Sequence, residues 1–560
     1  MRLLLALAYD LFVFVFVLLA LPLRLAFRGR PAYLAVDVTR DIPWRSEPRS
    51  WWRGRRAARR PASLKTLSDK LELTAKDRRI RGVVFKVEGF EGSGAKLAEI
   101  RRMARSLRER GKEVVFYGRA VTTREYALMA SGSRVWIAPG GRVDLRGFSA
   151  SLYVLGQTLE RFGIRAQFLR RGSHKTAPEL FTDREVSEAQ RETVGHILAD
   201  ALETSVEAIA QGRNRPADEV RRLVDEGPYT ASRALAVGLI DGVGDSDDLE
   251  KALAEGKEKK ARLVPITHYQ GSSPFRARYK RPLPLPAIGV VRIDGVIKLG
   301  ESLDAPWAPR AAGSDTVAHA LQRAREDRRI KALVLHIDSR GGSSLASELM
   351  LKSVKRVAEK KPVVVFVDRV AASGGYMAAL GATHFIVAPN AITGSIGVFS
   401  GKFELSRLME MLGVGKAVLR MGANSALESP FEPWSDAERA TLDQEIEETY
   451  RDFLRAVADG RRMPVEEVEP LAEGRVYTGR RAQALGLADE LGGFEDAVRK
   501  AAELAKLRKR PQVVAIGIPS RSLRALTGPK ATEVFEALRP LEAERVFAHA
   551  GWWPRIEPEP

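Results

Sequence analysis

The sequence Asp77-Arg78-Arg79-Ile80 recurs as Asp327-Arg328-Arg329-Ile330, an offset of 250 positions in a chain of 560 residues. Further matches keep an offset of 250, or of 248 for the last pair: Val114-Val115-Phe116 with Val364-Val365-Phe366, Tyr126 with Tyr376, Gly163 with Gly413, and Tyr229-Thr230 with Tyr477-Thr478. Because chance does not easily hold one offset over about a hundred residues, the pattern predicts two copies of one domain.

Each copy alternates short apolar runs with amphipathic stretches. Strands are predicted at residues 83–87, 114–117, 333–337 and 363–367, and helices at residues 97–108 and 347–359. Short, β-branched apolar runs are typical of buried parallel strands. The alternation of strand and helix therefore predicts an α/β fold with right-handed crossovers in each copy.

The repeat divides the chain into five parts. Residues 256–284 are rich in Lys, Arg, Pro and Ser, which predicts a linker. Nothing in the first half matches about the last fifty residues, where a short helix is predicted at residues 531–538, before Pro540. The predicted parts are an N-terminal membrane anchor (1–30), a first repeat domain (31–255), the linker (256–284), a second repeat domain (285–505) and a C-terminal tail (506–560).

Residues 3–23 form an apolar run that contains one acidic residue, Asp10. At about 1.5 Å per residue this run spans roughly 30 Å, the thickness of a hydrocarbon core. A cleaved signal peptide is the alternative. The length of the run favours an uncleaved, single-pass anchor, and so do three arginines in residues 24–30, where small cleavage-site residues would be expected. Residues 44–60 mix Trp with Arg, as a membrane-surface segment does.

Composition excludes several classes of site. The chain contains no cysteine, which excludes disulfides, thiolate metal sites and a cysteine nucleophile. The formal net charge is +20, which suits either a nucleic-acid partner or an anionic membrane surface. Because the basic residues are spread along the chain and no nucleic-acid motif accompanies them, we expect a membrane-lipid partner and no nucleic acid.

The two copies differ where a predicted strand ends. The second copy continues after residue 337 as Asp338-Ser339-Arg340-Gly341-Gly342-Ser343, whereas the first copy has Glu88-Gly89-Phe90-Glu91-Gly92-Ser93. A Gly-Gly pair after a strand can expose backbone N–H groups as an oxyanion hole, although such turns are common in proteins without one.

A serine follows the next strand of the second copy, in Ala371-Ala372-Ser373-Gly374-Gly375-Tyr376. It precedes a helix predicted at residues 376–380, and a nucleophile at such a strand-to-helix turn is held exposed, with glycines leaving room for substrate. The alternative is that Ser373 only caps the helix. In the first copy, Thr123 stands at the equivalent position.

A serine nucleophile needs a base, and the seven histidines form no recognisable triad motif. The first copy offers Lys175, where the second copy has Ser425. A lysine is usually solvated, and it acts as a base only where burial lowers its pKa, to about 5–6 at the extreme. The first copy thus has a candidate base without a serine, and the second has a serine without the lysine. This asymmetry predicts one composite site.

These residues together resemble the long, tandem-domain form of the signal peptide peptidase A (protease IV) family, from the N-terminus to about residue 505. The motifs are Ala372-Ser373-Gly374-Gly375-Tyr376, Thr393-Gly394-Ser395-Ile396-Gly397, the Gly341-Gly342 turn and the segment around Lys175. The resemblance implies two tandem Clp/crotonase-like β-α-β repeat domains after an N-terminal transmembrane helix. One departure is Arg340, which replaces a proline usual in the family and leaves the turn less preorganised.

The resemblance also implies a role for each motif residue. Ser373 is expected to be the nucleophile and Lys175 the general base, and Ser395 is expected to orient the lysine. The residues expected to support the oxyanion hole are Gly341, Gly342 and Gly374. No metal and no cofactor are expected.

Partners and location follow from the same resemblance. We expect a homotetramer that encloses its active sites, and peptide substrates such as remnant signal peptides, which enter a hydrophobic groove. The anchor is expected in the bacterial inner (cytoplasmic) membrane, with the catalytic body in the periplasm. The arginines after the anchor favour the opposite orientation, although long folded regions can be exported despite flanking charge.

Two other functions stay open at this point. A crotonase-like acyl-CoA enzyme would share the oxyanion turn, but it would need acidic residues over a thioester and a CoA site. A non-catalytic membrane scaffold would keep the fold alone, yet both positions of the Ser/Lys pair are filled. The anchor and the Ser/Lys asymmetry favour a serine protease, a membrane-bound endopeptidase.

Overall fold

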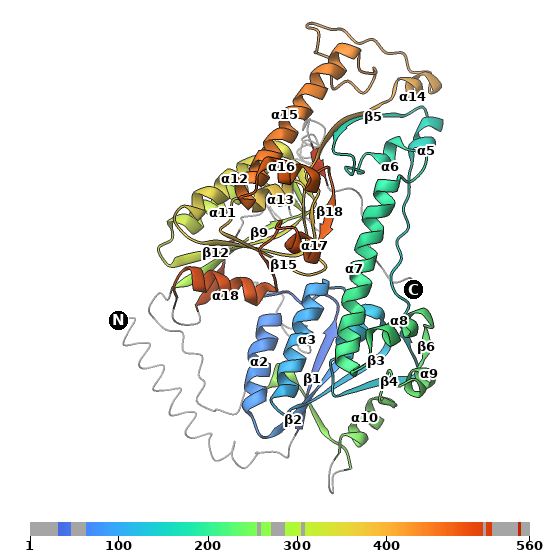
Figure 1. Cartoon of the computed structure of the whole chain (residues 1–560), viewed down its shortest axis with the longest axis vertical. Coiled ribbons are helices and arrows are strands. Elements are labelled where there is room, and N and C mark those ends of the chain that lie inside the picture. Colours follow the sequence, from blue (N-terminus) through green and yellow to red (C-terminus); the bar gives the residue numbers. More distant parts are fainter. Residues whose placement is uncertain are drawn as a thin grey trace, which may run out of the picture. The chain divides into compact units, whose positions relative to one another are not determined.

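The computed structural model (Figure 1) contains two compact units. The first includes Met1–Phe148 and Leu202–Leu285, and the second includes Ser149–Ala201 and Pro286–Glu557. A segment of the first copy, Ser149–Ala201, is therefore part of the unit that contains the second copy. The predicted base and the predicted nucleophile consequently belong to the same unit.

The structure describes residues 32–45, 63–254, 259–269, 286–303, 309–507, 511–517 and 547–549. The predicted anchor (1–30), the predicted helix (531–538) and most of the Trp- and Arg-rich stretch (44–60) lie outside these residues. Among the residues that are described, no helix combines the length and the apolar character needed to span a bilayer.

The first unit is built on a seven-stranded sheet in the order β6-β4-β3-β2-β1-β8, with β7 beside β4. Neighbouring strands run parallel except for β4 and β6. Strand β2 is buried without interruption from Gly82 to Phe85, as expected of a strand that helices cover on both faces. The strands are β1 (Ala32–Thr39), β2 (Ile80–Glu88), β3 (Glu113–Thr122), β4 (Arg134–Asp144), β6 (Tyr229–Thr230), β7 (Gly242–Val243) and β8 (Arg262–Pro265).

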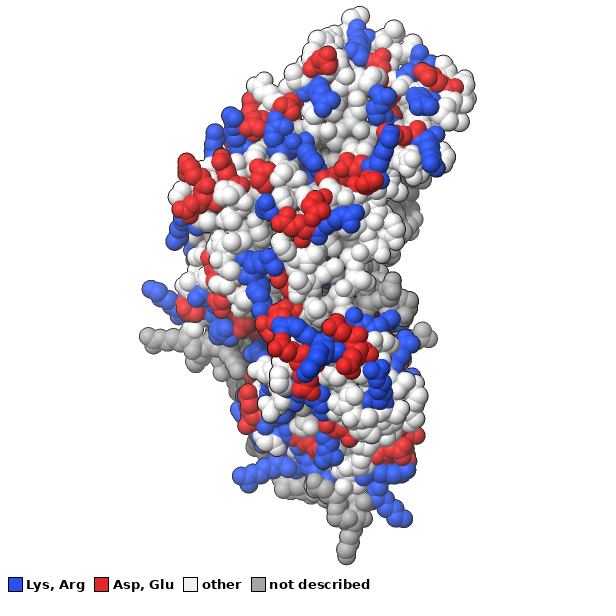
Figure 2. All heavy atoms as spheres, turned by 45° about the vertical axis from the view of Figure 1, so that its right-hand side comes forward, with Lys and Arg blue, Asp and Glu red and all other residues white. Residues whose placement is uncertain are grey.

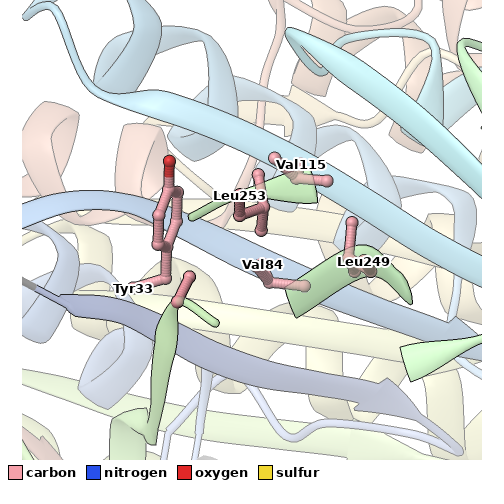
Figure 3. Close-up of a cluster of buried hydrophobic side chains, with 6 residues drawn as sticks. Tyr33, Val84, Val115, Leu249 and Leu253 are labelled. Carbon is pink, nitrogen blue, oxygen red and sulfur yellow. The ribbon is translucent and has the colours of Figure 1, made fainter. Parts of the chain in front are cut away.

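Helices and one 3-10 turn complete the first unit. The serine hydroxyls of Ser63 and Ser93 accept from the first turns of α2 and α3, which fixes where these helices begin. Figure 3 shows part of the core, where Tyr33, Val84, Val115, Leu249 and Leu253 pack together. The helical segments are α2 (Leu64–Lys76), α3 (Gly94–Glu109), α4 (Thr123–Met129), α8 (Ala217–Asp225), α9 (Ala231–Ala236), α10 (Ser246–Ala252) and η2 (Ile266–His268).

The second unit repeats the sheet, in the order β18-β16-β14-β12-β9-β20, with β15 beside β14 and β19 beside β15. Its strands are β9 (Ala287–Asp294), β12 (Ile330–Ser339), β14 (Val363–Ala372), β15 (His384–Val387), β16 (Ile392–Gly394), β18 (Val476–Thr478), β19 (Glu490–Leu491) and β20 (Gln512–Ala515). Its helical segments are α5 (Gly156–Arg161), α6 (Glu179–Thr182), α11 (Ser314–Glu326), α12 (Ser344–Ala358), α13 (Gly374–Ala379), α14 (Ser406–Met411), α15 (Asp436–Arg461), α16 (Val465–Val468), η3 (Glu469–Leu471), α17 (Gly479–Ala484) and α18 (Phe494–Leu504). Helix α7 (Glu188–Arg213) contains residues of both units.

A further sheet of the second unit contains a strand from the first copy. Its order is β11-β10-β13-β21-β17-β5. Strand β5 pairs antiparallel with β17, from Val398 opposite Arg171 to Glu404 opposite Arg165. This pairing fastens the segment that follows β5, which carries Lys175, to the unit that carries Ser373. The strands are β5 (Arg165–Arg171), β10 (Val296–Lys298), β11 (Ala311–Gly313), β13 (Gly341–Ser343), β17 (Val398–Glu404) and β21 (Phe547–His549).

The prediction of an α/β fold with parallel sheets is confirmed. The four predicted strands lie within β2, β3, β12 and β14, and the predicted helices correspond to α3, α12 and α13. Two further strands lie in the predicted linker and tail: β8 lies within residues 256–284 and β20 within residues 506–560. The two strands are 250 positions apart and pair in parallel with β1 and β9, so the repeat continues into the tail. Short edge strands constrain few side chains, which explains why the sequence match was missed.

Charges of both signs are mixed on the face of the molecule that Figure 2 draws. Figure 2 shows Lys and Arg side chains interspersed with Asp and Glu side chains on the face drawn. In the second unit, the guanidinium of Arg171 pairs with Asp443 and Glu447, each at 2.7 Å. On this face the positive charge is therefore not gathered into one basic stripe.

Candidate active site

Ser373 lies between the end of β14 and the start of α13. Its backbone has φ 55° and ψ −121°, a conformation that is costly for a residue with a Cβ. Its N–H donates to the carbonyl oxygen of Gly394 at 2.8 Å. Its side chain makes no capping hydrogen bond to α13, so the hydroxyl does not serve as a helix cap.

The glycines after Ser373 allow the turn to lie close to α12 and to the end of β12. A Cβ at Gly374 would approach the Ser347 hydroxyl oxygen to 2.2 Å, and a Cβ at Gly375 would approach the Ser339 carbonyl oxygen to 2.7 Å. Both distances are shorter than real Cβ contacts, so these positions require glycine. The strained serine is thereby held against the turn that the sequence predicts as an oxyanion hole.

Lys175 is buried, with 1% of its surface exposed. Its Nζ lies 2.9 Å from Ser373 Oγ, 3.0 Å from the Ser395 carbonyl oxygen and 3.0 Å from Ser395 Oγ. Burial lowers the pKa of Lys175 well below its ordinary value of 10.5. The structure thus brings together three of the predicted site residues around a desolvated amine.

Ser395 is itself held in an unusual conformation. It follows β16, has φ 53° and is 1% exposed. Its N–H donates to the Arg475 carbonyl oxygen at 2.6 Å. A fixed backbone at this position aims both of its oxygens at the Lys175 amine.

The segment around Lys175 is secured by contacts from its own copy. The Arg170 guanidinium donates to the Lys175 carbonyl oxygen at 3.3 Å and to Glu179 at 2.6 Å. Glu179 is 1% exposed and also accepts from the Ser187 hydroxyl at 2.6 Å. These bonds tie the backbone of the lysine to the start of α6.

Gly341 and Gly342 form the start of β13, with φ values of 100° and 155°. A Cβ at Gly342 would lie 2.0 Å from the Ile297 carbonyl oxygen, so only glycine fits beside β10. The Gly341 N–H donates to Ser339 Oγ at 3.1 Å. A Cβ at Gly374 would lie 3.4 Å from the Gly341 Cα, which shows that the predicted oxyanion glycines are neighbours.

Beside these glycines is a strand position that takes an extended segment. In the structure β21 occupies it and pairs antiparallel with β13, with Gly341 opposite His549 and Gly342 opposite Ala548. On the other side β21 meets β17 at Phe399. Phe399 belongs to an aromatic cluster, with its ring 6.1 Å from that of Phe168. The position is thus bordered by backbone hydrogen-bonding groups and by an apolar side chain.

Sequence reasoning did not single out Asp338, a partly buried acid next to the turn. Burial, and then the neighbouring Asp368 carboxylate, raise the pKa of Asp338 to about 6. The Nε2 of His336 lies 2.9 Å from Asp368 Oδ1, within hydrogen-bond distance. The available signal was an acidic residue directly after an apolar strand, which alone is too common to be diagnostic.

A comparison with protein families matches the description "Peptidase family S49" over residues 106–260 and 355–508, one region in each copy. The chain belongs to peptidase family S49. The S49 regions together cover more than half of the chain, and their placement agrees with the duplication seen in the sequence and in the two sheets.

Curated relatives of this S49 chain cover most of its length. It is 30% identical over 476 residues to a chloroplastic serine protease SPPA of Arabidopsis thaliana, covering 82% of this chain and 69% of the relative. It is 31% identical over 446 residues to protease 4 of Salmonella typhi, covering 77% and 70%. The predicted resemblance to the protease IV family is therefore confirmed, and the chain is a member of a serine peptidase family.

Two solved structures resemble parts of this S49 chain at low sequence identity. A ClpP1 mutant of Listeria monocytogenes is 15% identical and covers 37% of this chain and 93% of its own, with a TM-score of 0.25. A membrane-bound stomatin-specific protease mutant is 16% identical and covers 42% and 99%, with a TM-score of 0.27.

Proposed function

We propose that this chain is a membrane-bound serine endopeptidase with a Ser/Lys dyad, which degrades remnant signal peptides and other short hydrophobic peptides. Ser373 is the nucleophile and Lys175 is the general base. The observation that carries the proposal is the 2.9 Å hydrogen bond between Lys175 Nζ and Ser373 Oγ around a fully buried amine. A Ser/Lys dyad accounts for a lysine that is desolvated against a strained serine.

The three contacts of the amine suit a neutral base. A neutral amine has two N–H groups and one lone pair, so the two N–H groups donate to the carbonyl and hydroxyl oxygens of Ser395. The lone pair then accepts the Ser373 O–H. In this arrangement Ser395 orients the lysine, and the proton of the nucleophile already points at the base.

The reaction proceeds in two balanced steps. Ser373 Oγ bonds to the scissile carbonyl carbon while its proton moves to Lys175. The ammonium then gives that proton to the leaving amine as the C–N bond breaks, leaving an acyl-enzyme. Water gives its proton to Lys175, attacks the ester, and the proton returns to Ser373 as the C–O bond breaks.

Backbone N–H groups around the glycine turn stabilise the oxyanion in both steps. They belong to the region where Gly341, Gly342 and Gly374 meet. One donor of this kind contributes about 3 kcal/mol to lowering the barrier. The Gly341 N–H, which donates to Ser339 Oγ, keeps the turn in shape.

The substrate binds as an extended strand between β13 and β17. The support is that β21 pairs antiparallel at this position, in the manner of strand addition to an exposed sheet edge. Main-chain pairing is independent of sequence, while the cluster of Phe168, Phe181, Phe399 and Phe403 favours apolar side chains. This combination suits hydrophobic peptides of varied sequence.

The membrane and the assembly complete the proposal. Residues 3–23 serve as an uncleaved anchor in the bacterial inner membrane, with the catalytic body in the periplasm and four chains forming a homotetramer. The apolar run is long enough to span a hydrocarbon core of roughly 30 Å. Protease accessibility of the body in sealed spheroplasts tests its side, and light scattering of the detergent-solubilised chain tests its assembly.

The dyad is tested by cleavage of an internally quenched apolar peptide. Ser373→Ala and Lys175→Met should each lower kcat/KM by about 10³-fold or more, because the two groups act as a unit. Methionine keeps the length of the lysine side chain in an apolar site, so the thermal midpoint should not fall. Activity retained in either folded variant would contradict the proposed function.

A further inference from the structure

A turn that follows α15 and η3 has an unexpected residue in it. The Arg475 N–H donates to the Ala472 carbonyl oxygen at 2.9 Å, and the two central residues, Glu473 and Gly474, have φ values of 52° and 73°. Positive φ at both central positions defines a type I′ turn, in which Asn-Gly, Asp-Gly and Gly-Gly are preferred. Glutamate is a strained choice there, so the backbone alone does not explain it.

Glu473 contacts the two residues that precede the proposed base. Its carbonyl oxygen accepts the His174 N–H at 2.7 Å, and its carboxylate Oε2 accepts the Ser173 N–H at 2.7 Å. Helix α15 in turn holds Glu473, because the Tyr450 hydroxyl accepts the Glu473 N–H at 3.3 Å. One residue thus satisfies two consecutive backbone donors of the segment that carries Lys175.

The backbones of the two segments lie too close for side chains between them. A Cβ at Gly474 would lie 2.4 Å from the Lys175 nitrogen, and a Cβ at Gly172 would lie 2.5 Å from the Glu473 carbonyl carbon. The same turn also supports Ser395, whose N–H donates to the Arg475 carbonyl oxygen at 2.6 Å. The turn therefore supports both the base and the residue that orients it.

The first copy has no such turn at the equivalent position. With the offset of 248 that relates Tyr229 to Tyr477, Glu473 corresponds to Asp225. Asp225 is the last residue of α8, and the next residue, Glu226, is helical with φ −83°. The turn is thus specific to the copy that contains the serine, as expected of a feature that serves the reaction rather than the fold.

We propose that Glu473 is a positioning residue for the general base: its carbonyl and carboxylate oxygens hold residues 173–175 so that the Lys175 amine stays out of water and against Ser373. The inference rests on the dyad proposed above. Without the carboxylate, the Ser173 N–H needs water, and water that enters beside the segment solvates the amine. Solvation favours the charged form, so fewer molecules hold a neutral base at a given pH.

Other charged groups lie near this contact. The His174 imidazole lies 3.4 Å from Glu192, and Glu192 lies 3.5 Å from Arg475. On the other flank, Arg170 pairs with Glu179. Glu192 therefore offers a matched control, a carboxylate beside the same segment whose recorded contacts are the side chains of His174 and Arg475.

The test measures kcat/KM against pH for the full chain with the apolar peptide reporter. Glu473→Gly removes the carboxylate and relieves the positive-φ strain, so a loss cannot come from the backbone conformation. We expect the acid limb of its profile of kcat/KM against pH to move up by about one pH unit. At a given pH on that limb, kcat/KM should fall about tenfold. Glu473→Gln keeps an oxygen acceptor and should restore the limb to within a few tenths of a unit. Glu192→Gln should match the wild type.

A second variant allows the same test if Glu473→Gly does not fold. Tyr450→Phe removes the group that holds Glu473 while leaving the turn sequence intact, and it should move the limb in the same direction by less. The positioning role would be overturned if the acid limb of Glu473→Gly matched that of the wild type. It would also be overturned if Glu192→Gln moved the acid limb as far as Glu473→Gly does. Either result leaves the dyad standing provided that Lys175→Met is inactive, whereas an active Lys175→Met rejects the proposed function itself.

Discussion

The strand-to-helix turns at Thr123 and Ser373 occupy the same position in the two copies, yet their side chains make different hydrogen bonds and their backbones differ in conformation. In the first copy Thr122 and Glu125 form a capping box on α4, and the Thr123 hydroxyl donates to the Asp144 carbonyl oxygen at 3.2 Å. In the second copy Ser373 has positive φ, makes no capping bond and faces Lys175. One fold thus holds either a stable helix start or a strained serine.

The neighbouring residues explain which outcome each copy reaches. In the first copy Glu125 accepts the Phe90 N–H at 2.9 Å, and Arg124 donates to the Gly92 carbonyl oxygen at 2.9 Å. These long side chains occupy the turn that corresponds to the proposed oxyanion region. At the positions equivalent to Arg124 and Glu125, the second copy has glycines. The absence of side chains at these two positions, as well as the presence of a serine, therefore distinguishes the copy that contains the proposed nucleophile from the other copy.

The largest effect should come from giving the second copy a side chain of the first. Gly375→Glu introduces Glu125's side chain at a position where even a Cβ would lie 2.7 Å from the Ser339 carbonyl oxygen. We expect a loss of about 10³-fold or more in kcat/KM for the peptide reporter, because the glycine turn and the serine lose their geometry. The unfolding free energy should also fall by about 1–3 kcal/mol.

The matched control for that variant lies in the first copy. Glu125→Gly removes the capping box from α4 and should lower the unfolding free energy of its unit by about 1–2 kcal/mol. Peptide cleavage at a temperature where the chain is folded should stay at the wild-type level. Loss of cleavage in Glu125→Gly, or wild-type cleavage in Gly375→Glu, would contradict the proposed difference between the two turns.

A smaller effect is expected where the apolar strands β2 and β12 end. Burial raises the pKa of Asp338 to about 6, above the value near 3.9 of an unfolded chain. The folded state then binds the extra proton between pH 4 and 6, so stability falls as pH rises through this window. Asp338→Asn should gain about 1–3 kcal/mol at pH 8, and the gain should vanish as pH approaches 4.

Glu88, the residue equivalent to Asp338 in the first copy, provides the contrast. It is exposed, so Glu88→Gln should change the unfolding free energy by less than about 0.5 kcal/mol at either pH. Urea unfolding of both variants at pH 5 and pH 8 measures the difference. An Asp338→Asn gain that does not depend on pH would mean that ionisation of this group is not its cause.

The smallest effect is expected from Thr123→Ser. This change places the hydroxyl of the second copy in the first, but without positive φ and without a buried amine. We expect the unfolding free energy to fall by about 1 kcal/mol, because the change removes a buried methyl group. With Ser373→Ala in the same chain, a fluorophosphonate probe should label nothing at position 123. Labelling there would show that the hydroxyl alone suffices.

Periodicity and the offset predicted most of the framework. The strands containing residues 83–87 and 333–337 are apolar at most of their buried positions, so they can be recognised in the sequence as buried strands. Ser373 stood out because glycines follow it, and Lys175 because the serine needed a base. These features could be predicted because they depend on which residue types follow one another along the chain.

Other features depend on tertiary context and could not be predicted in the same way. The sequence places residues 149–201 in the first copy, whereas pairing of β5 with β17 makes them part of the second unit. Glu473 gave no signal, because its importance lies in a positive-φ turn that glutamate rarely adopts. Strand β8 was not predicted within residues 256–284, because an edge strand of four residues needs little apolar sequence.

The most direct test of the dyad is the rate at which a fluorophosphonate acylates Ser373, followed by mass spectrometry across pH. The wild-type rate should rise with pH and level off well below 10.5, because burial lowers the pKa of Lys175. Lys175→Met should react about 10³-fold more slowly at every pH. Equal rates in the two proteins, or a label on another residue, would contradict the account.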